Sequence, residues 1–464
     1  MIEENKKAII WSGLEKGSTY LVNILIQIIL ARLLSPEDYG VIAMLSIFFA
    51  ISQAFIDSGF TTTLIQKQDC TKKDYNSVFT FNILVSLIFY LVFFIAAPYL
   101  EKFYNFNNLT SVIRVYSLNL ILNSFSMVHR VKLMKSLQFK EITIITFISS
   151  ILSALPAIIL AYSGWGYWAL ILQVITNSIL STILTLAKTK WIPHMEISKD
   201  SIKKLAPLGI RVMIVSQFHA IYNNIYSILI GKKFNAIELG YFDRGKTLAG
   251  TGSIGFSDFY MRALFPIQSK IQSDNILLEK SYNQSFNLIC ILILPFSLFI
   301  STFSKEFIVL LYGEKWISCA PLLSILTIGY LLYPLQNLNI NILKVKGYGH
   351  FLLKSEFIKK AIGLLVALLI INFNLIIVAW GWTLCAIFEF LISEYYYFKA
   401  CNFSISKNLI YFSKLLIVYI ILSNTIYFII TQYITNKYLI IILGAIIYLV
   451  VYFIINKKQF RKFI

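Results

Sequence analysis

Polar and charged side chains recur at helical spacing inside several long apolar segments of the chain. Segment 12–33 carries one such stripe, and its members lie three or four residues apart: Ser12, Glu15, Thr19, Asn23 and Gln27. Segments 40–65, 206–230 and 240–266 carry similar stripes. A charge at the centre of a bilayer costs roughly 2.5–3.5 kcal/mol on insertion scales, so these stripes are expected to face a cavity or a partner rather than lipid.

Cations in these segments outnumber the carboxylates placed to neutralise them. A dry cavity lined by Lys and Arg favours an anion, and phosphate or pyrophosphate suits the hydrogen-bonding geometry of both side chains. The side chains predicted to bind such a ligand are Lys16, Asn23, Arg114, Arg211, Asn223, Arg244 and Lys246. An alternative place for Lys16, Arg114 and Arg211 is the membrane interface, where a long side chain reaches water.

Carboxylates on the same stripes could carry a coupling proton or sodium ion. They are Glu15, Asp57, Asp243 and Asp258. Asp57 and Asp258 can also be interpreted as polar residues near the cytoplasmic ends of their helices. The five cysteines form no C-x-x-C pair and the four histidines are scattered, so the sequence predicts no metal site and no cofactor beyond such an ion.

Two short motifs suggest other chemistry and have better structural explanations. Gly250–Gly255 satisfies G-x-G-x-x-G, but no strand precedes it, so nucleotide binding is not predicted. Glu37-Asp38 resembles the acidic motif of lipid-linked-sugar glycosyltransferases, which place it on a long structured loop. The loop here is short, and we interpret it as a polar turn. No Walker A motif, H-E-x-x-H or nucleophile elbow is present either, so ATP-driven transport by this chain alone is not expected. The short outside loops also count against a membrane enzyme, and we do not expect one.

The elements that position these residues are predicted to be transmembrane helices. Hydrophobic residues make up 58% of the chain and charged residues 14%, whereas soluble proteins are nearer half apolar and a quarter charged. The net charge of +19 comes from short Lys and Arg clusters between apolar runs, a pattern of membrane topology rather than of nucleic-acid binding. The predicted fold class is an all-α polytopic membrane protein.

Apolar segments of about 20 residues predict fourteen spans, of which 240–266 is the most polar. With the N-terminus inside, most Lys and Arg fall on the cytoplasmic side, so both termini are predicted to be cytoplasmic. Hairpins are expected to turn at two Trp/Gly clusters, 163–166 and 380–382.

The chain also repeats itself at an offset of about 200 residues, with 29–40 matching 229–240. Both copies begin from the same side of the membrane, which predicts two parallel, pseudo-symmetric six-helix lobes around a central cavity and a C-terminal helical hairpin. The predicted boundaries are 1–190 for the N-terminal lobe, 191–205 for a cytoplasmic linker, 206–400 for the C-terminal lobe and 401–464 for the hairpin.

Several of these segments resemble a known family. Ala31–Gly40, Asp57–Phe60 and Leu64–Lys67 resemble the opening of bacterial polysaccharide exporters, and Leu239–Phe242 and Phe265–Lys270 resemble the second-half segments of the same family. These exporters are the lipopolysaccharide O-antigen flippases of the multidrug/oligosaccharidyl-lipid/polysaccharide superfamily. The similarity is greatest to the branch of colanic acid and teichuronic acid exporters.

The resemblance implies a flippase that moves undecaprenyl-pyrophosphate-linked oligosaccharide from the inner to the outer leaflet of the bacterial cytoplasmic membrane. It implies alternating access through a cavity lined by helices 1, 2, 7 and 8, coupling to an ion gradient, and polysaccharide assembly proteins as candidate partners. The alternatives are a cation-coupled drug or metabolite antiporter of the same fold, a flippase for the peptidoglycan precursor, and a membrane polysaccharide polymerase or glycosyltransferase.

Overall fold

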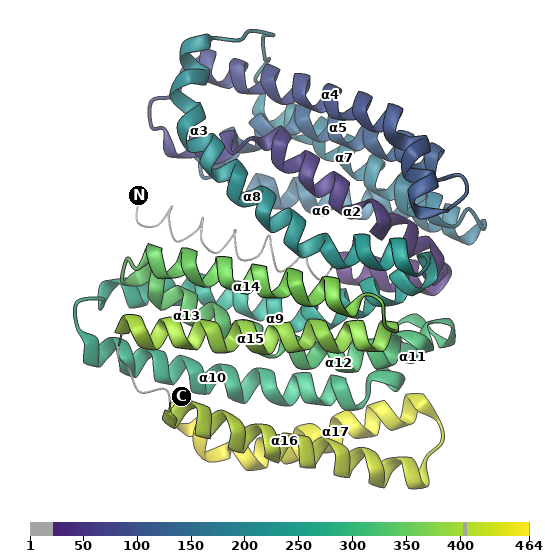
Figure 1. Ribbon diagram of the computed structural model, residues 1–464, viewed down its shortest axis with the longest axis vertical. Coiled ribbons are helices and arrows are strands. Elements are labelled where there is room, and N and C mark those ends of the chain that lie inside the picture. The colour runs from purple at the N-terminus through teal and green to yellow at the C-terminus, as the bar shows by residue number, and fades with distance from the viewer. Residues whose placement is uncertain (1–21, 402–405, 464) are drawn as a thin grey trace. The chain divides into compact units, whose positions relative to one another are not determined.

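The computed structural model describes residues 22–401 and 406–463, and every regular element in these ranges is a helix (Figure 1). The prediction of an all-α chain is therefore confirmed. The chain folds into two compact units, residues 1–240 and 241–464. The predicted boundaries of the lobes, the linker and the hairpin stay predictions.

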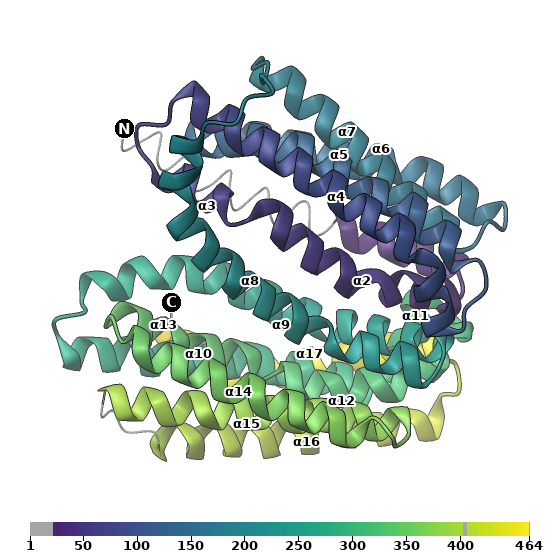
Figure 2. The same cartoon turned by 45° about the horizontal axis from the view of Figure 1, so that its top comes forward.

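In the first unit, a helix over Val22–Leu33 precedes α2 to α8. Their bounds are α2 (Pro36–Asp57), α3 (Phe60–Gln66), α4 (Lys72–Tyr104), α5 (Leu109–Lys135), α6 (Phe139–Tyr162), α7 (Tyr167–Thr189) and α8 (Lys199–Lys233). Helices α4 to α7 run side by side, and α2 packs along α8 (Figure 2). Helix α9 (Ala236–Lys270) begins in the first unit and continues into the second.

The second unit holds most of α9 and the rest of the chain. Its remaining elements are α10 (Asn275–Thr302), α11 (Ser304–Tyr312), the 3-10 helix η1 (Glu314–Cys319), α12 (Ala320–Tyr330), α13 (Tyr333–Val345), α14 (Gly349–Ile370), α15 (Leu375–Cys401), α16 (Ser406–Tyr433) and α17 (Lys437–Phe463). The last two helices pack against α10 and α11 (Figure 1). Buried side chains of α10, α13 and α15 form the core, with Tyr419 of α16 and Tyr452 of α17 added to it.

The number of membrane spans agrees with the prediction only in part. Within the described ranges, eleven helical segments are long and apolar enough to cross a membrane. The other predicted spans fall on the shorter Val22–Leu33 helix and on α9 and α14, which are more highly charged. The chain is a multi-pass membrane protein, and the count of fourteen stays a prediction.

Helix α2 begins at a complete capping box. The Asp38 amide donates to Ser35 Oγ (3.3 Å), and the Ser35 amide donates to Asp38 Oδ2 (2.8 Å), so two otherwise unpaired amides are satisfied. Pro36 occupies the first turn, where its missing N–H costs nothing. The acidic pair Glu37-Asp38 therefore belongs to the first turn of α2 rather than to a loop.

The glycines of the two repeat copies pack against each other's helix starts. An ideal Cβ on Gly40 of α2 would lie 1.7 Å from the carbonyl oxygen of Ala236, and one on Gly240 of α9 would lie 1.8 Å from that of Pro36. Only glycine permits so close a backbone approach between membrane helices. The matching positions of the repeat thus form a reciprocal contact inside the first unit.

One of the two predicted Trp/Gly turns is confirmed and the other is wrong. Residues 163–166 connect α6 to α7, and both Gly164 (φ 81°) and Gly166 (φ 55°) have positive φ. Residues 380–382, in contrast, lie inside α15.

The α14–α15 turn lies earlier, at residues 371–374. Its position has a local cause, because Asn374 Oδ1 accepts a hydrogen bond from the Ile377 amide (2.9 Å) at the start of α15. Gly381 has a different role. An ideal Cβ there would lie 2.1 Å from the Ile370 side chain, so this glycine lets α14 and α15 approach closely.

Candidate functional site

The second unit brings three of the predicted site residues together on α9. The Arg244 guanidinium donates to Asp243 Oδ2 from Nε (3.1 Å) and Nη2 (2.7 Å), and both side chains are mostly buried. Lys246 interacts electrostatically with the same carboxylate. The cluster therefore presents a guanidinium and an ammonium beside one shared carboxylate.

Close packing fixes the adjacent part of α9. An ideal Cβ on Gly245 would lie 3.3 Å from Cys319 Sγ, and that thiol donates to the Tyr241 carbonyl (3.2 Å). The Tyr241 hydroxyl donates to the Lys315 carbonyl (3.3 Å). These contacts hold α9 against η1 and the start of α12, so the Asp243–Arg244–Lys246 cluster lies on a closely packed part of α9.

Arg114 lies apart from this cluster, in the first unit. Its Nε donates to the Phe94 carbonyl of α4 (3.3 Å), and its guanidinium carbon lies 4.1 Å from the centre of the Phe94 ring. It also lines a pocket of about 480 Å³ with Glu101 and Thr110, near the α4–α5 turn. Its contacts therefore match the interfacial alternative as well as a binding role.

Two predicted residues lie on α8, whose span is the least buried of the eleven. Arg211 and Asn223 are exposed on this helix. Its other side contacts α2, where the Gln217 side-chain amide donates to the Ile51 carbonyl (3.0 Å). Asn23, on the Val22–Leu33 helix, is exposed as well.

The remaining carboxylates differ in setting. Asp57 Oδ1 accepts hydrogen bonds from the amide and hydroxyl of Thr61 at the break between α2 and α3. Asp258 is exposed on α9. Glu15 and Lys16 lie outside the described residues.

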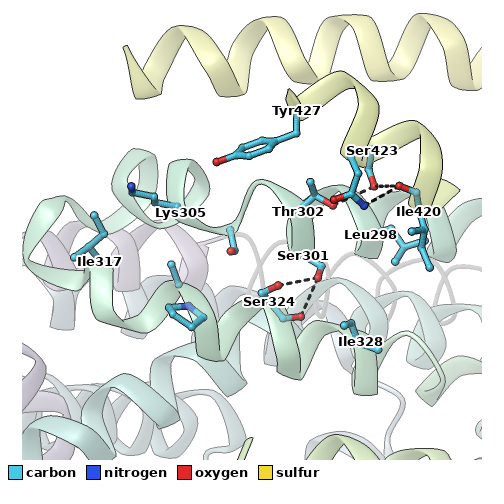
Figure 3. A pocket seen from close by; sticks show the side chains of 14 residues that line it. Leu298, Ser301, Thr302, Lys305, Ile317, Ser324, Ile328, Ile420, Ser423 and Tyr427 are labelled. Atoms are coloured by element: carbon cyan, nitrogen blue, oxygen red, sulfur yellow. Dashed lines mark hydrogen bonds between the residues drawn. The ribbon is translucent and has the colours of Figure 1, made fainter. Parts of the chain in front are cut away.

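A pocket of about 780 Å³ in the second unit was not predicted (Figure 3). It lies between α10, α11, α12 and α16, and several hydroxyl groups line it beside apolar side chains. Ser301 Oγ is 3.0 Å from Ser324 Oγ, and Thr302 donates to Ser423 (3.1 Å). The Lys305 side chain lines it too. The serines and threonines near the ends of the predicted spans were the available signal, but their convergence depends on the packing of the C-terminal hairpin.

Among the described residues, no group of three or more His, Cys, Asp or Glu side chains could hold a metal ion. The five cysteines are thiols and form no disulfide with one another.

Comparison with known proteins identifies relatives of the chain. The family described as "Polysaccharide biosynthesis protein" matches residues 29–321. The teichuronic acid biosynthesis protein TuaB of Bacillus subtilis is 22% identical, over 83% of this chain and 80% of that protein. This agrees with the predicted branch of polysaccharide exporters.

Solved structures share the fold. A structure of the lipid II flippase MurJ in an inward closed conformation has a TM-score of 0.76 at 13% identity, covering 97% of this chain and all of that one. An inward-facing multidrug resistance MATE transporter of the MOP superfamily has a TM-score of 0.63 at 14% identity, covering 83% of this chain and 95% of that one. At these identities, the two likenesses concern the fold of the chain.

Proposed function

Since the chain belongs to the polysaccharide biosynthesis protein family, we propose that it flips an undecaprenyl-pyrophosphate-linked oligosaccharide from the inner to the outer leaflet of the bacterial cytoplasmic membrane. The family match carries the proposal. The similarity to TuaB supports a polysaccharide repeat unit as cargo, and the fold shared with a lipid II flippase suits a lipid-linked substrate. Both termini are cytoplasmic in this proposal.

The substrate's pyrophosphate binds Arg244 and Lys246, which already share a carboxylate on α9. A guanidinium binds phosphate oxygens through the same parallel N–H groups with which it binds a carboxylate. Arg211, Asn23 and Asn223 are exposed side chains that could contact the phosphate or the glycan, and Lys16 completes the cationic set. The prenyl tail stays in lipid.

Translocation follows alternating access, with the two predicted lobes rocking about the bound pyrophosphate and glycan. Coupling to an ion gradient drives it, with Glu15, Asp57, Asp243 and Asp258 as candidate carriers of the ion. Polysaccharide assembly proteins act on the product at the outer leaflet.

A drug or metabolite antiporter is the second candidate, because the MATE fold is shared. Such a protein would select organic cations, whereas the α9 cluster contains two cations and one acid. The family match also favours the polysaccharide substrate.

Depletion of the protein in its native bacterium tests the proposal. Lipid-linked oligosaccharides and surface polysaccharide are measured together. We expect prenyl-pyrophosphate glycan to accumulate on the cytoplasmic side and surface polymer to fall, with rescue by wild type but not by Arg244→Ala. Arg262→Ala, an exposed arginine on the same helix, is the matched control and should rescue. If neither pool changes on depletion, the flippase is excluded and the antiporter becomes the better hypothesis.

A further inference from the structure

The second unit contains a buried carboxylate that the sequence analysis did not select. Glu394 lies on α15 and is 5% exposed. Its neighbours come from two other helices, Tyr282 of α10 (1% exposed) and Asn339 of α13 (0% exposed). Three membrane helices therefore converge on one acid, and an ionisable residue inside a membrane protein is a default candidate for function.

The hydrogen bonds that Glu394 accepts in this cluster all end on one oxygen of its carboxylate. Asn339 Nδ2 donates to Glu394 Oε1 (3.0 Å), and the Tyr282 hydroxyl lies 3.4 Å from the same atom. That hydroxyl also donates to Asn339 Oδ1 (2.7 Å), so it orients the amide. Among the described residues, no hydrogen bond reaches Oε2, which leaves this oxygen able to take a proton.

No lysine or arginine in the described part of the chain forms an ion pair with Glu394. The titratable groups that interact with it are the phenols of Tyr282 and Tyr397 and the thiol of Cys290. Glu279 of α10 interacts with Tyr397 rather than supplying a cation. On α14, the buried Lys359 ammonium binds Glu356 instead (2.9 Å). A buried acid without a cation is costly when ionised, so a proton is its natural counter-charge.

The surroundings suit a proton better than a sodium ion. A sodium ion needs several oxygen atoms pointing at it, but Asn339 Oδ1 and Glu394 Oε1 already accept hydrogen bonds from N–H and O–H donors. The donors and acceptors around Glu394 are thus arranged for a carboxyl group that gains and loses one hydrogen.

A change at Glu394 can reach the backbone through α13. Asn339 belongs to α13, a short helix that is separated from α12 by a break at Leu331-Leu332, and Pro334 prevents continuous hydrogen bonding across it. Ionisation of Glu394 strengthens its hydrogen bond to Asn339, and protonation weakens it. The break lets α13 respond to this difference by itself.

We propose that Glu394 binds and releases the proton that couples the flippase to the membrane proton gradient. This inference rests on the proposed function. In each cycle the carboxylate takes up one proton from the outer side and becomes a neutral acid, and the same proton leaves to the cytoplasm after the conformational change.

Purified protein in vesicles with lipid-linked oligosaccharide tests this. Wild type should flip the substrate faster when the solution on the vesicle side that corresponds to the cell exterior is acidic. Glu394→Gln keeps the size of the side chain and an oxygen that accepts from Asn339, so the variant should fold. Under the acidic gradient it should flip the substrate only at the rate that is seen without a gradient. Glu356→Gln, which removes an acid already paired with Lys359, is the matched control and should keep it. The assignment would be overturned if the proton gradient accelerated Glu394→Gln as much as wild type. It would also be overturned if a sodium gradient, but not a proton gradient, accelerated wild type.

Infrared titration of the purified protein decides the question without transport. The chain has 22 Asp and Glu residues, so the pH-dependent protonated-carboxyl signal of wild type is compared with that of the variant. Glu394→Gln should lack one component of this signal, with helical circular dichroism unchanged. A band that is the same in both overturns the inference. If wild type flips no substrate under any gradient, the proposed function fails, while this titration still decides whether Glu394 exchanges a proton. If Glu394→Gln does not fold, Glu394→Asp takes its place. A carboxyl band that titrates with the same midpoint pH in Glu394→Asp as in wild type would refute the assignment.

Discussion

We predict that Gly40→Ala destabilises the first unit by separating α2 from the start of α9. The new Cβ would lie 1.7 Å from the Ala236 carbonyl oxygen and 2.5 Å from its carbon. Carbon normally approaches a carbonyl oxygen no closer than about 3.3 Å, so the two helix starts would have to move apart by about 1.6 Å.

The size of the effect follows from what blocks the methyl group. Overpacking typically costs about 1–3 kcal/mol, because neighbouring side chains rotate or shift to make room. The obstruction here is backbone, which cannot rotate away, so we expect a loss of about 3 kcal/mol. That is a large fraction of the roughly 5–15 kcal/mol by which a folded domain is stable.

The assay is thermal unfolding of the purified protein in detergent, followed by tryptophan fluorescence. Gly40→Ala and Gly240→Ala should each lower the melting temperature. The double variant should lower it by less than the sum, because the first methyl group already separates the helices. Gly349→Ala is the control, since no atom lies within 4 Å of its Cβ position. If Gly40→Ala melts like Gly349→Ala, the reciprocal glycine contact is not part of the folded protein.

Three further predictions concern the helix caps, the anion site and the topology. Thr71→Ala removes the capping box of α4 and should cost about 1 kcal/mol in the same melting assay, and an unchanged melting temperature would contradict that role. Arg244→Lys keeps the charge but loses the guanidinium, which can donate two hydrogen bonds at once. In depleted cells it should therefore restore surface polysaccharide to a level between those given by wild type and by Arg244→Ala. In a cysteine-free background, Ser163→Cys in the α6–α7 turn should react with a membrane-impermeant maleimide on whole cells, whereas Lys190→Cys after α7 should react only after lysis. The reverse pattern would invert the proposed topology.

The fold could be predicted where one short stretch of chain decides it. The turn at 163–166 contains two glycines with positive φ, and no distant contact is needed to explain it. The similar cluster at 380–382 misled the prediction because its glycine serves tertiary packing against Ile370 of the preceding helix. The residue that starts α15 is Asn374, whose capping role becomes recognisable once the helix start is known.

The sequence offers Asp243 and Arg244 as candidate site residues but does not predict that they pair. Asp243 and Arg244 were both candidates, yet adjacent positions on a helix do not face each other, so their ion pair could not be derived from spacing. Glu394 was missed because its partners lie far along the chain. Asn339 and Tyr282 are 55 and 112 residues away, and only the packing of three helices brings them together.

The Asp243–Arg244 pair gives the proposed anion site a property that a lone arginine would lack. In the structure, Asp243 Oδ2 accepts from Nε and Nη2, one of the edges through which the guanidinium could bind a pyrophosphate. A phosphate that binds this edge of the guanidinium in the proposed site would replace the carboxylate on Arg244, while Lys246 would still interact with Asp243. The exchange lowers the net gain from binding, since one charge-assisted pair is broken for each that forms. A transporter benefits from this, because a pyrophosphate held by an uncontested arginine would be slow to leave on the outer side, whereas here Asp243 re-forms its pair as the substrate departs.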